Sequence, residues 1–400
     1  MTVRQAVLVG RMVLAVAALL TVHGGSRAAT TAVQPTHDGQ VLETLAAPTV
    51  RRQAVASAGR AALPIQLPAL LQQVRSEVAL ARETGDPRHW GRAQALLAPW
   101  WDQAGAPVDI AVLQATVQQG RHAFDAARAL LRDAVAREPA HAQAWLELAA
   151  LERLRGHYPD SLRACEAVAR AGAALYGAAC RLETRSLLGE HEDAVAGLQL
   201  LIREVRSPGQ RGWLLSLLAE ALERSGDDVR ALQAYRASLR AQSDLYTAIA
   251  LSDLLLRSGQ VAAALAVLEA LAPTDAVLLR RASAMRRLGD DRWRSVHTGL
   301  QGRAAELLRR GDNPDLHGRE AALIAMWLDD DPHRALQLAQ LNLLLQREPL
   351  DWWVALHSAA KAGDAAAWTQ LQRQRQATGL HDRRLEEVPA PRPMASGRRP

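Results

Sequence analysis

Residues 142–168 read AQAWLELAALERLRGHYPDSLRACEAV, and this stretch decides the fold. Large apolar residues recur three and four positions apart on both sides of Gly156, which is the spacing of two amphipathic helices separated by a turn. The small residues Ala149 and Ser161 allow two antiparallel helices to approach closely, and larger neighbours fill the hollows beside them. Gly156 is expected to end the first helix, because glycine adopts the left-handed conformation there at least cost. The stretch therefore predicts a helical hairpin.

Glycine returns between later helical stretches, with intervals of 33, 37, 33 and 30 residues, at Gly156, Gly189, Gly226, Gly259 and Gly289. Self-similarity with a period of about 34 residues is typical of a helical repeat array. The chain contains a single Phe, and the residues that favour strands are scarce outside its N-terminal segment. We therefore predict an all-α protein.

The small and large positions of this hairpin recur elsewhere in the chain. Residues 218–235 and 251–268 repeat them, and residues 124–139 match the second half of a unit. In these positions the chain resembles the tetratricopeptide (TPR) superfamily over about residues 66–380. The resemblance implies a TPR-like α-solenoid of about nine antiparallel helix pairs, which we place at residues 66–104, 107–139, 142–173, 174–208, 211–243, 244–273, 275–311, 315–349 and 350–379.

A second resemblance covers the later repeats. The segments Arg309-Arg-Gly-Asp312 and Gln346-Arg-Glu-Pro349 are similar to those of exported proteobacterial TPR proteins of unassigned function. The resemblance implies a membrane or periplasmic assembly component as a candidate partner. A TPR match is specific for the fold and silent on the ligand, because unrelated functions share it.

The two ends of the chain differ from the helical part. Residues 1–28 combine Arg4 and Arg11 with an apolar run and small residues near Ala28, a pattern that predicts a secretory signal peptide cleaved after Ala28. We therefore expect an exported protein, periplasmic or secreted, with no direct membrane insertion after cleavage. Residues 29–63 are expected to form a flexible linker, and residues 381–400 a disordered tail.

The basic charge of the chain is concentrated at these ends. The formal net charge is +6, and residues 1–28 and 381–400 contribute +3 and +2 of it. The remaining body is nearly neutral and lacks the clustered positive charge that phosphate binding requires. We therefore expect no nucleic-acid partner.

Cys165 and Cys180 are the only cysteines. In the repeat register they fall on the second helix of one repeat and the first helix of the next, which pack together. A disulfide is favoured in an oxidising compartment. Two small buried thiols are the alternative.

Catalytic motifs are absent: the sequence contains no His-Glu-x-x-His, Gly-x-Ser-x-Gly, P-loop, dinucleotide-binding or Cys-x-x-Cys pattern. The histidines near the turns are well separated in sequence, so we expect neither a metal site nor a cofactor. The Trp pairs 100–101 and 352–353 suggest sugar stacking, although adjacent helical residues point about 100° apart and core packing is the more ordinary use.

The TPR resemblance also implies a binding groove, because the second, ninth and thirteenth positions of each first helix line the concave face in that family. These positions give an aromatic set, an acidic set and an arginine set: Tyr176, Trp213 and Tyr246; Glu183, Glu220 and Asp253; Arg224 and Arg257. We interpret them as a groove for a peptide with basic and apolar side chains. The alternative is an ordinary charged helix surface, with pairs four residues apart such as Glu220 and Arg224.

Together these features predict a non-enzymatic, exported scaffold or adaptor that binds a protein or peptide partner in its concave groove. The alternative is a carbohydrate- or cell-envelope-associated binding module that uses exposed tryptophan.

Overall fold

The computed structural model describes residues 67–101, 103, 105–309 and 318–391, and the regular structure of these residues is entirely helical. The expected signal peptide and linker, and residues 392–400, lie outside the described residues. None of the helices in the described part of the chain has the length and apolar character that a membrane span requires.

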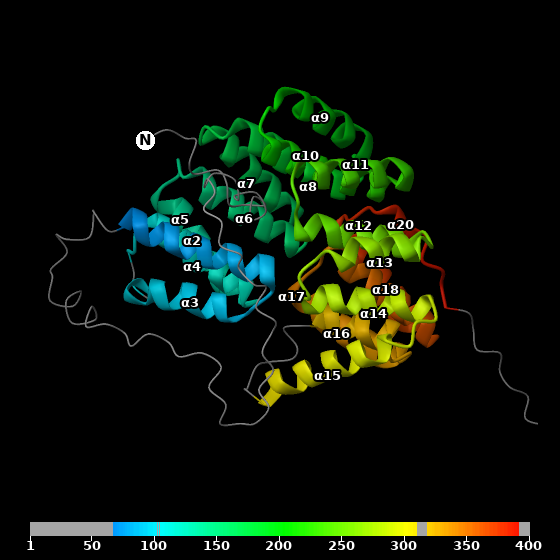
Figure 1. Cartoon of the computed structure of the whole chain (residues 1–400). Coiled ribbons are helices and arrows are strands. Elements are labelled where there is room, and N and C mark those ends of the chain that lie inside the picture. The colour runs from blue at the N-terminus through cyan, green and yellow to red at the C-terminus, as the bar shows by residue number, and fades with distance from the viewer. Residues whose placement is uncertain (1–66, 102, 104, 310–317, 392–400) are drawn as a thin grey trace, which may run out of the picture.

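The helices follow one another in antiparallel pairs (Figure 1). Nine pairs are present in the described part of the chain, in the positions that the sequence predicted: α2 (Leu67–Thr84) with α3 (Arg88–Leu97) and the 3-10 turn η4 (Ala98–Trp100); α4 (Val108–Gly120) with α5 (Phe124–Arg137); α6 (Ala142–Leu154) with α7 (Tyr158–Arg170); α8 (Ala174–Leu187) with α9 (His191–Glu204); α10 (Pro208–Ser225) with α11 (Asp228–Ala241); α12 (Leu245–Arg257) with α13 (Val261–Glu269); α14 (Asp275–Arg287) with α15 (Trp293–Arg309); α16 (Gly318–Trp327) with α17 (Pro332–Leu345); and α18 (Pro349–Ala362) with α19 (Ala365–Thr378). The prediction of an all-α, TPR-like solenoid is confirmed.

The recurring glycines occupy the turns inside the pairs. All five have positive φ, between 74° and 94°. Gly226 shows the arrangement: it ends α10 in the left-handed conformation, and the side chain of Asp227 then accepts the backbone N–H of Arg230 to cap α11. Glycine adopts this conformation without the Cβ penalty, and an aspartate N-cap satisfies a free N–H of the next helix. Turn and cap together reverse the chain within three residues.

The first helix of a pair lies deeper than the second. In α10 twelve residues are buried, whereas in α11 only four are, among them Ala231 and Tyr235. First helices contact their own partner and the first helices of neighbouring pairs, as α10 does with α8. The first helices therefore form an inner layer, and α9 lies at the outer edge of the curve in Figure 1.

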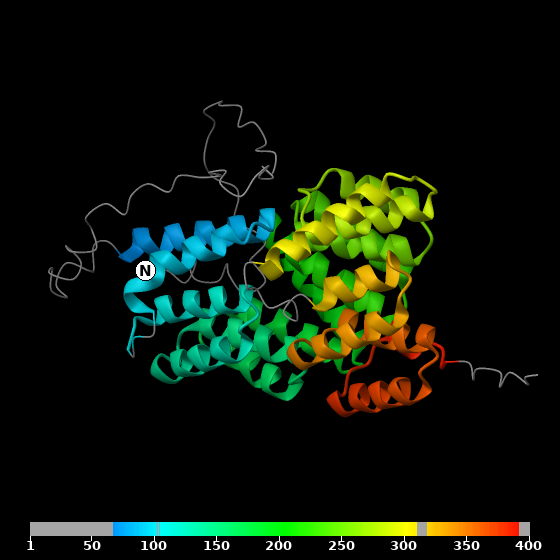
Figure 2. The ribbon, with the colours of Figure 1, turned by 90° about the horizontal axis from the view of Figure 1, so that it is seen from below.

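The last part of the chain returns to the central repeats. The backbone N–H of Arg347 donates to the carbonyl of Leu154 at 2.8 Å, and that of His381 to the carbonyl of Leu187 at 2.8 Å. One apolar core joins Tyr158 and Leu187 of the central repeats to residues of α16, α18 and the C-terminal segment. Figures 1 and 2 both show α18 and α20 (Arg383–Glu386) beside the central helices.

We call residues 380–388 the C-terminal strap. Leu385 and Val388 are buried, and Asp382 is buried and caps α20. The expected disorder is therefore wrong for residues 381–391. Composition suggested a disordered tail, but the short helix α20 buries Leu385 and the bend that follows it buries Val388.

A disulfide joins Cys165 on α7 to Cys180 on α8, with the two Cα atoms 5.5 Å apart. This separation lies within the ordinary range for a disulfide, and both residues are buried. The pairing that the sequence favoured is confirmed over the alternative of two thiols. It fixes one repeat to the next.

Replacing both cysteines by alanine should lower the free energy of unfolding by about 3 kcal/mol, because the cross-link closes a loop of about 15 residues in the unfolded chain. Urea denaturation of the wild type and the double variant measures the difference. Adding reductant to the wild type should reproduce it. Equal stability of oxidised and reduced protein would contradict this expectation.

Candidate functional site

The eight predicted groove residues lie on three successive first helices, as the register required. Tyr176 and Glu183 belong to α8, whereas the later residues belong to α10 and α12. The rings of Tyr176 and Trp213 stack with centroids 5.3 Å apart. The third aromatic differs, because the hydroxyl of Tyr246 donates to Oε1 of Glu220 at 3.0 Å. Stacking thus joins two of the three residues in the predicted aromatic set.

The predicted acids are not open to solvent as a row. Glu183 is 2 % exposed and lies 3.1 Å from Nε of Arg153 on α6. Glu220 is 8 % exposed and pairs with Arg224 at 3.3 Å, the spacing of four residues that the sequence left open as an alternative.

Asp253 continues the same pattern on α12. Its two oxygens accept hydrogen bonds from Nε and Nη2 of Arg280 on α14 at 2.7 and 2.8 Å. Burial alone would lower the pKa of Arg280, but the charge and hydrogen bonds of Asp253 raise it above its ordinary value. The guanidinium therefore stays charged beside the carboxylate.

The predicted arginines also bind within the chain. Arg224 donates to Oγ of Ser186 on α8 at 3.0 Å. Arg257 donates to Glu223 on α10 at 2.6 Å and to Asp228 on α11 at 2.7 Å. Polar contacts of this kind join successive inner helices from α6 to α14. We call them the rung network; its pairs are Arg153–Glu183, Ser186–Arg224, Glu223–Arg257 and Asp253–Arg280.

The sequence did not predict these pairs, because only ion pairs four residues apart within one helix were considered. The partners lie 30 residues apart for Arg153 and Glu183, and 34 for Arg257 and Glu223. Both separations are close to one repeat length. A search for an arginine about one repeat away from each acid could have found them.

Glu223, which the sequence did not single out, is the centre of the network. It accepts from the hydroxyl of Tyr235 at 2.8 Å and lies 2.9 Å from Arg384 of the strap, in addition to its bond with Arg257. Burial raises the pKa of Glu223, but the charges of Arg384 and Arg257 outweigh it and hold that pKa below its ordinary value. The carboxylate is therefore ionised, and both of its oxygens have partners within the chain.

A cavity of about 460 Å³ opens where the α10–α11 turn, the end of α12, α18 and the strap meet. We call it the strap cavity; its lining residues are Ser225, Gly226, Asp228, Arg257, Trp353, His357, Arg383, Arg384 and Glu387. Only Arg257 among them was a predicted site residue. Burial lowers the pKa of His357 to about 4, and the nearby charge of Lys361 acts in the same direction. The ring is therefore neutral at physiological pH.

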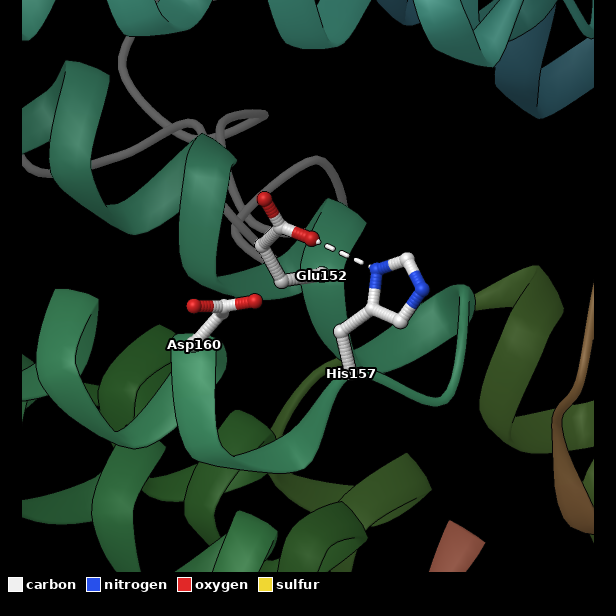
Figure 3. Close-up of side chains that lie close together, drawn as sticks. All are labelled: Glu152, His157 and Asp160. Carbon is white, nitrogen blue, oxygen red and sulfur yellow. Dashed lines mark hydrogen bonds and ion pairs between the residues drawn. The ribbon is translucent and has the colours of Figure 1, made fainter.

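One side-chain cluster has the composition of a metal site. Figure 3 shows Glu152, His157 and Asp160 close together, with Glu152 bonded to Nδ1 of His157 at 2.9 Å. Arg128, however, donates to both oxygens of Glu152 at 2.7 and 2.8 Å. Burial would raise the pKa of Glu152, but the hydrogen bonds from Arg128 and His157 lower it below its ordinary value. Because a guanidinium already neutralises this carboxylate, the cluster fits an ion-pair network better than a metal.

The paired helices, turn glycines and inner layer define the protein as a TPR-like α-solenoid. No family model matches the chain, and no curated protein matches it. Forty chains of solved structures match. Among them is the crystal structure of the TPR domain of P58(IPK), with 13% sequence identity over 79% of this chain and 96% of that chain and a TM-score of 0.23. A likeness at this level adds nothing to the fold assignment, which rests on the helices themselves.

Replacing Arg280 by methionine should lower the free energy of unfolding by about 3 kcal/mol, because it leaves the carboxylate of Asp253 without its partner. The double variant Arg280→Met/Asp253→Leu should recover most of that loss, since apolar residues can replace a buried pair. Urea denaturation measures both. A double variant as unstable as Arg280→Met would show that the pair does not act as a unit.

Proposed function

We propose that the protein is an exported, non-enzymatic scaffold that binds a protein or peptide partner on the inner face of its solenoid. Stacked helical repeats present extended concave surfaces of this kind. The observation that supports the proposal best is the strap cavity, which opens on the inner layer next to Arg257, one of the predicted groove residues. A concave site with a few converging polar groups is the ordinary form of a binding site.

The inner face offers only some of the predicted residues for direct contact. Tyr246 is 42% exposed, and Trp213 and Arg257 are half-buried. Glu183 and Glu220 are buried in or beside the rung network and would act by holding these side chains in place. The binding role of all eight residues stays a prediction.

The choice of partner follows from the proposed export. The Cys165–Cys180 disulfide fits an oxidising compartment such as the periplasm. A membrane or periplasmic assembly component is therefore the partner that we propose. The nearly neutral body of the chain argues against nucleic acid.

The carbohydrate-binding alternative depended on exposed tryptophan pairs. Trp352 is 2% exposed and lies in the C-terminal core. Trp100 and Trp101 pack against the apolar cluster of the first two helix pairs. These positions leave little paired tryptophan surface for stacking on sugars, so the protein scaffold is the better supported function.

Photo-crosslinking in the cells that make the protein tests the proposal. A benzophenone amino acid at Tyr246 or Arg383 should give discrete protein adducts, because both side chains are exposed at the inner face. The matched control is Leu200, which is 56% exposed on the outer helix α9. The same adducts from Leu200, or none from the inner positions, would contradict the proposal.

A further inference from the structure

A second cavity of about 320 Å³ lies at the C-terminal ends of α14, α16 and α18. We call it the basic cavity; its lining residues are Ser283, Arg286, Arg287, Met326, Trp327, Asp330 and Lys361. Three of these are cationic and one is acidic. The sequence analysis singled out none of them.

In the part of the chain that the structure describes, two of the three cations in this cavity have no acidic partner. Arg286 pairs with Asp330 and donates to the carbonyl of Trp327 at 2.7 Å. Arg287 donates one N–H to the carbonyl of Leu256 at 2.8 Å. Within the described residues, neither Arg287 nor Lys361 forms an ion pair, and both are exposed.

Their position at helix ends does not by itself explain this arrangement. A basic residue in the last turn interacts favourably with the dipole of its own helix. That effect requires only a charge near the helix end. Here cations from two different helices, α14 and α18, face one cavity, and an anion placed between them would interact with both.

One face of α18 connects the basic cavity to the strap cavity. Trp353, His357 and Lys361 lie four residues apart and so share that face. The ring centroids of Trp353 and His357 lie 4.0 Å apart, and those of Trp353 and Trp327 lie 6.4 Å apart in an edge-to-face arrangement. The eight-residue separation corresponds to roughly 12 Å of helix, which an extended peptide covers in about four residues. Figure 1 shows α12, α14, α18 and α20 gathered in this region.

We propose that this surface binds an extended acidic segment of the partner protein. A carboxylate of the segment lies between Lys361 and Arg287, and an aromatic or apolar side chain about four residues away lies against Trp353. Charge complementarity supports the assignment, because a basic segment would meet two uncompensated cations at the same place. The inference rests on the proposed function and names the chemistry of its partner. It replaces the basic peptide suggested by the sequence, because Glu183 and Glu220 already pair with Arg153 and Arg224.

Fluorescence anisotropy with the full chain tests the inference. The probes are labelled peptides of about eight residues with Asp or Glu four positions from Trp or Phe, and a second set with Lys or Arg in the acidic positions. The acidic set should bind the wild type, and Lys361→Glu should weaken it at least tenfold, because a charged hydrogen bond contributes roughly 1.5–3 kcal/mol. Lys361→Arg should retain binding of the acidic peptides. Arg287→Gln, which removes a positive charge without adding a negative one, should weaken that binding.

The control variant is Arg373→Glu, an exposed charge reversal on α19 away from both cavities. It should bind the acidic peptides as the wild type does. Equal affinity of the Lys361→Glu variant, or equal binding of the basic peptide set, would overturn the inference. If no peptide binds while crosslinks from Tyr246 persist, the inference fails and the proposed function stands. If those crosslinks are also absent, the proposed function is wrong, and the inference that rests on it is wrong as well.

Discussion

The carboxylate of Glu223 holds together three parts of the chain that are distant in sequence. It accepts from Tyr235 within its own helix pair, from Arg257 of the next pair, and lies 2.9 Å from Arg384 of the strap. Burying such a charge is costly unless every oxygen is satisfied. The position of the strap therefore depends on the packing of successive repeats, because both supply the partners of one carboxylate.

The rung network and the strap change what the solenoid offers to a partner. An open repeat array would present its inner acids to solvent as a charged row. Here Glu183 and Asp253 instead form ion pairs with arginines of neighbouring first helices. The strap covers part of the same inner layer, and even the turns are close to the returning chain. A Cβ added at Gly189 would lie 3.2 Å from His381, and one at Gly226 would lie 3.0 Å from Arg383. The glycines that fix the repeat period thus also leave room for the strap.

The sequence allowed the fold to be predicted almost completely, because helix pairs, turn glycines and the disulfide follow local rules. The recurring glycines and the TPR resemblance predicted nine helix pairs where the structure has them, and the repeat register predicted that Tyr176 and Trp213 lie next to each other. The site could be predicted only in part. Pairs such as Arg257 with Glu223 cross one repeat, and the contact between Arg384 and Glu223 crosses 161 residues. Such contacts depend on how the superhelix curves, which small angles between many helix pairs decide together. No local pattern contains that information.

The contacts of the C-terminal strap make it an integral part of the folded solenoid. Amide hydrogen exchange tests this most directly at His381, whose N–H donates to the carbonyl of Leu187. Exchange in native buffer should be slow at this amide, comparable to the buried amides of α10, because opening it requires the strap to detach from the inner layer. Exchange at the rate of an unstructured peptide would show that the strap is not held and would contradict the account.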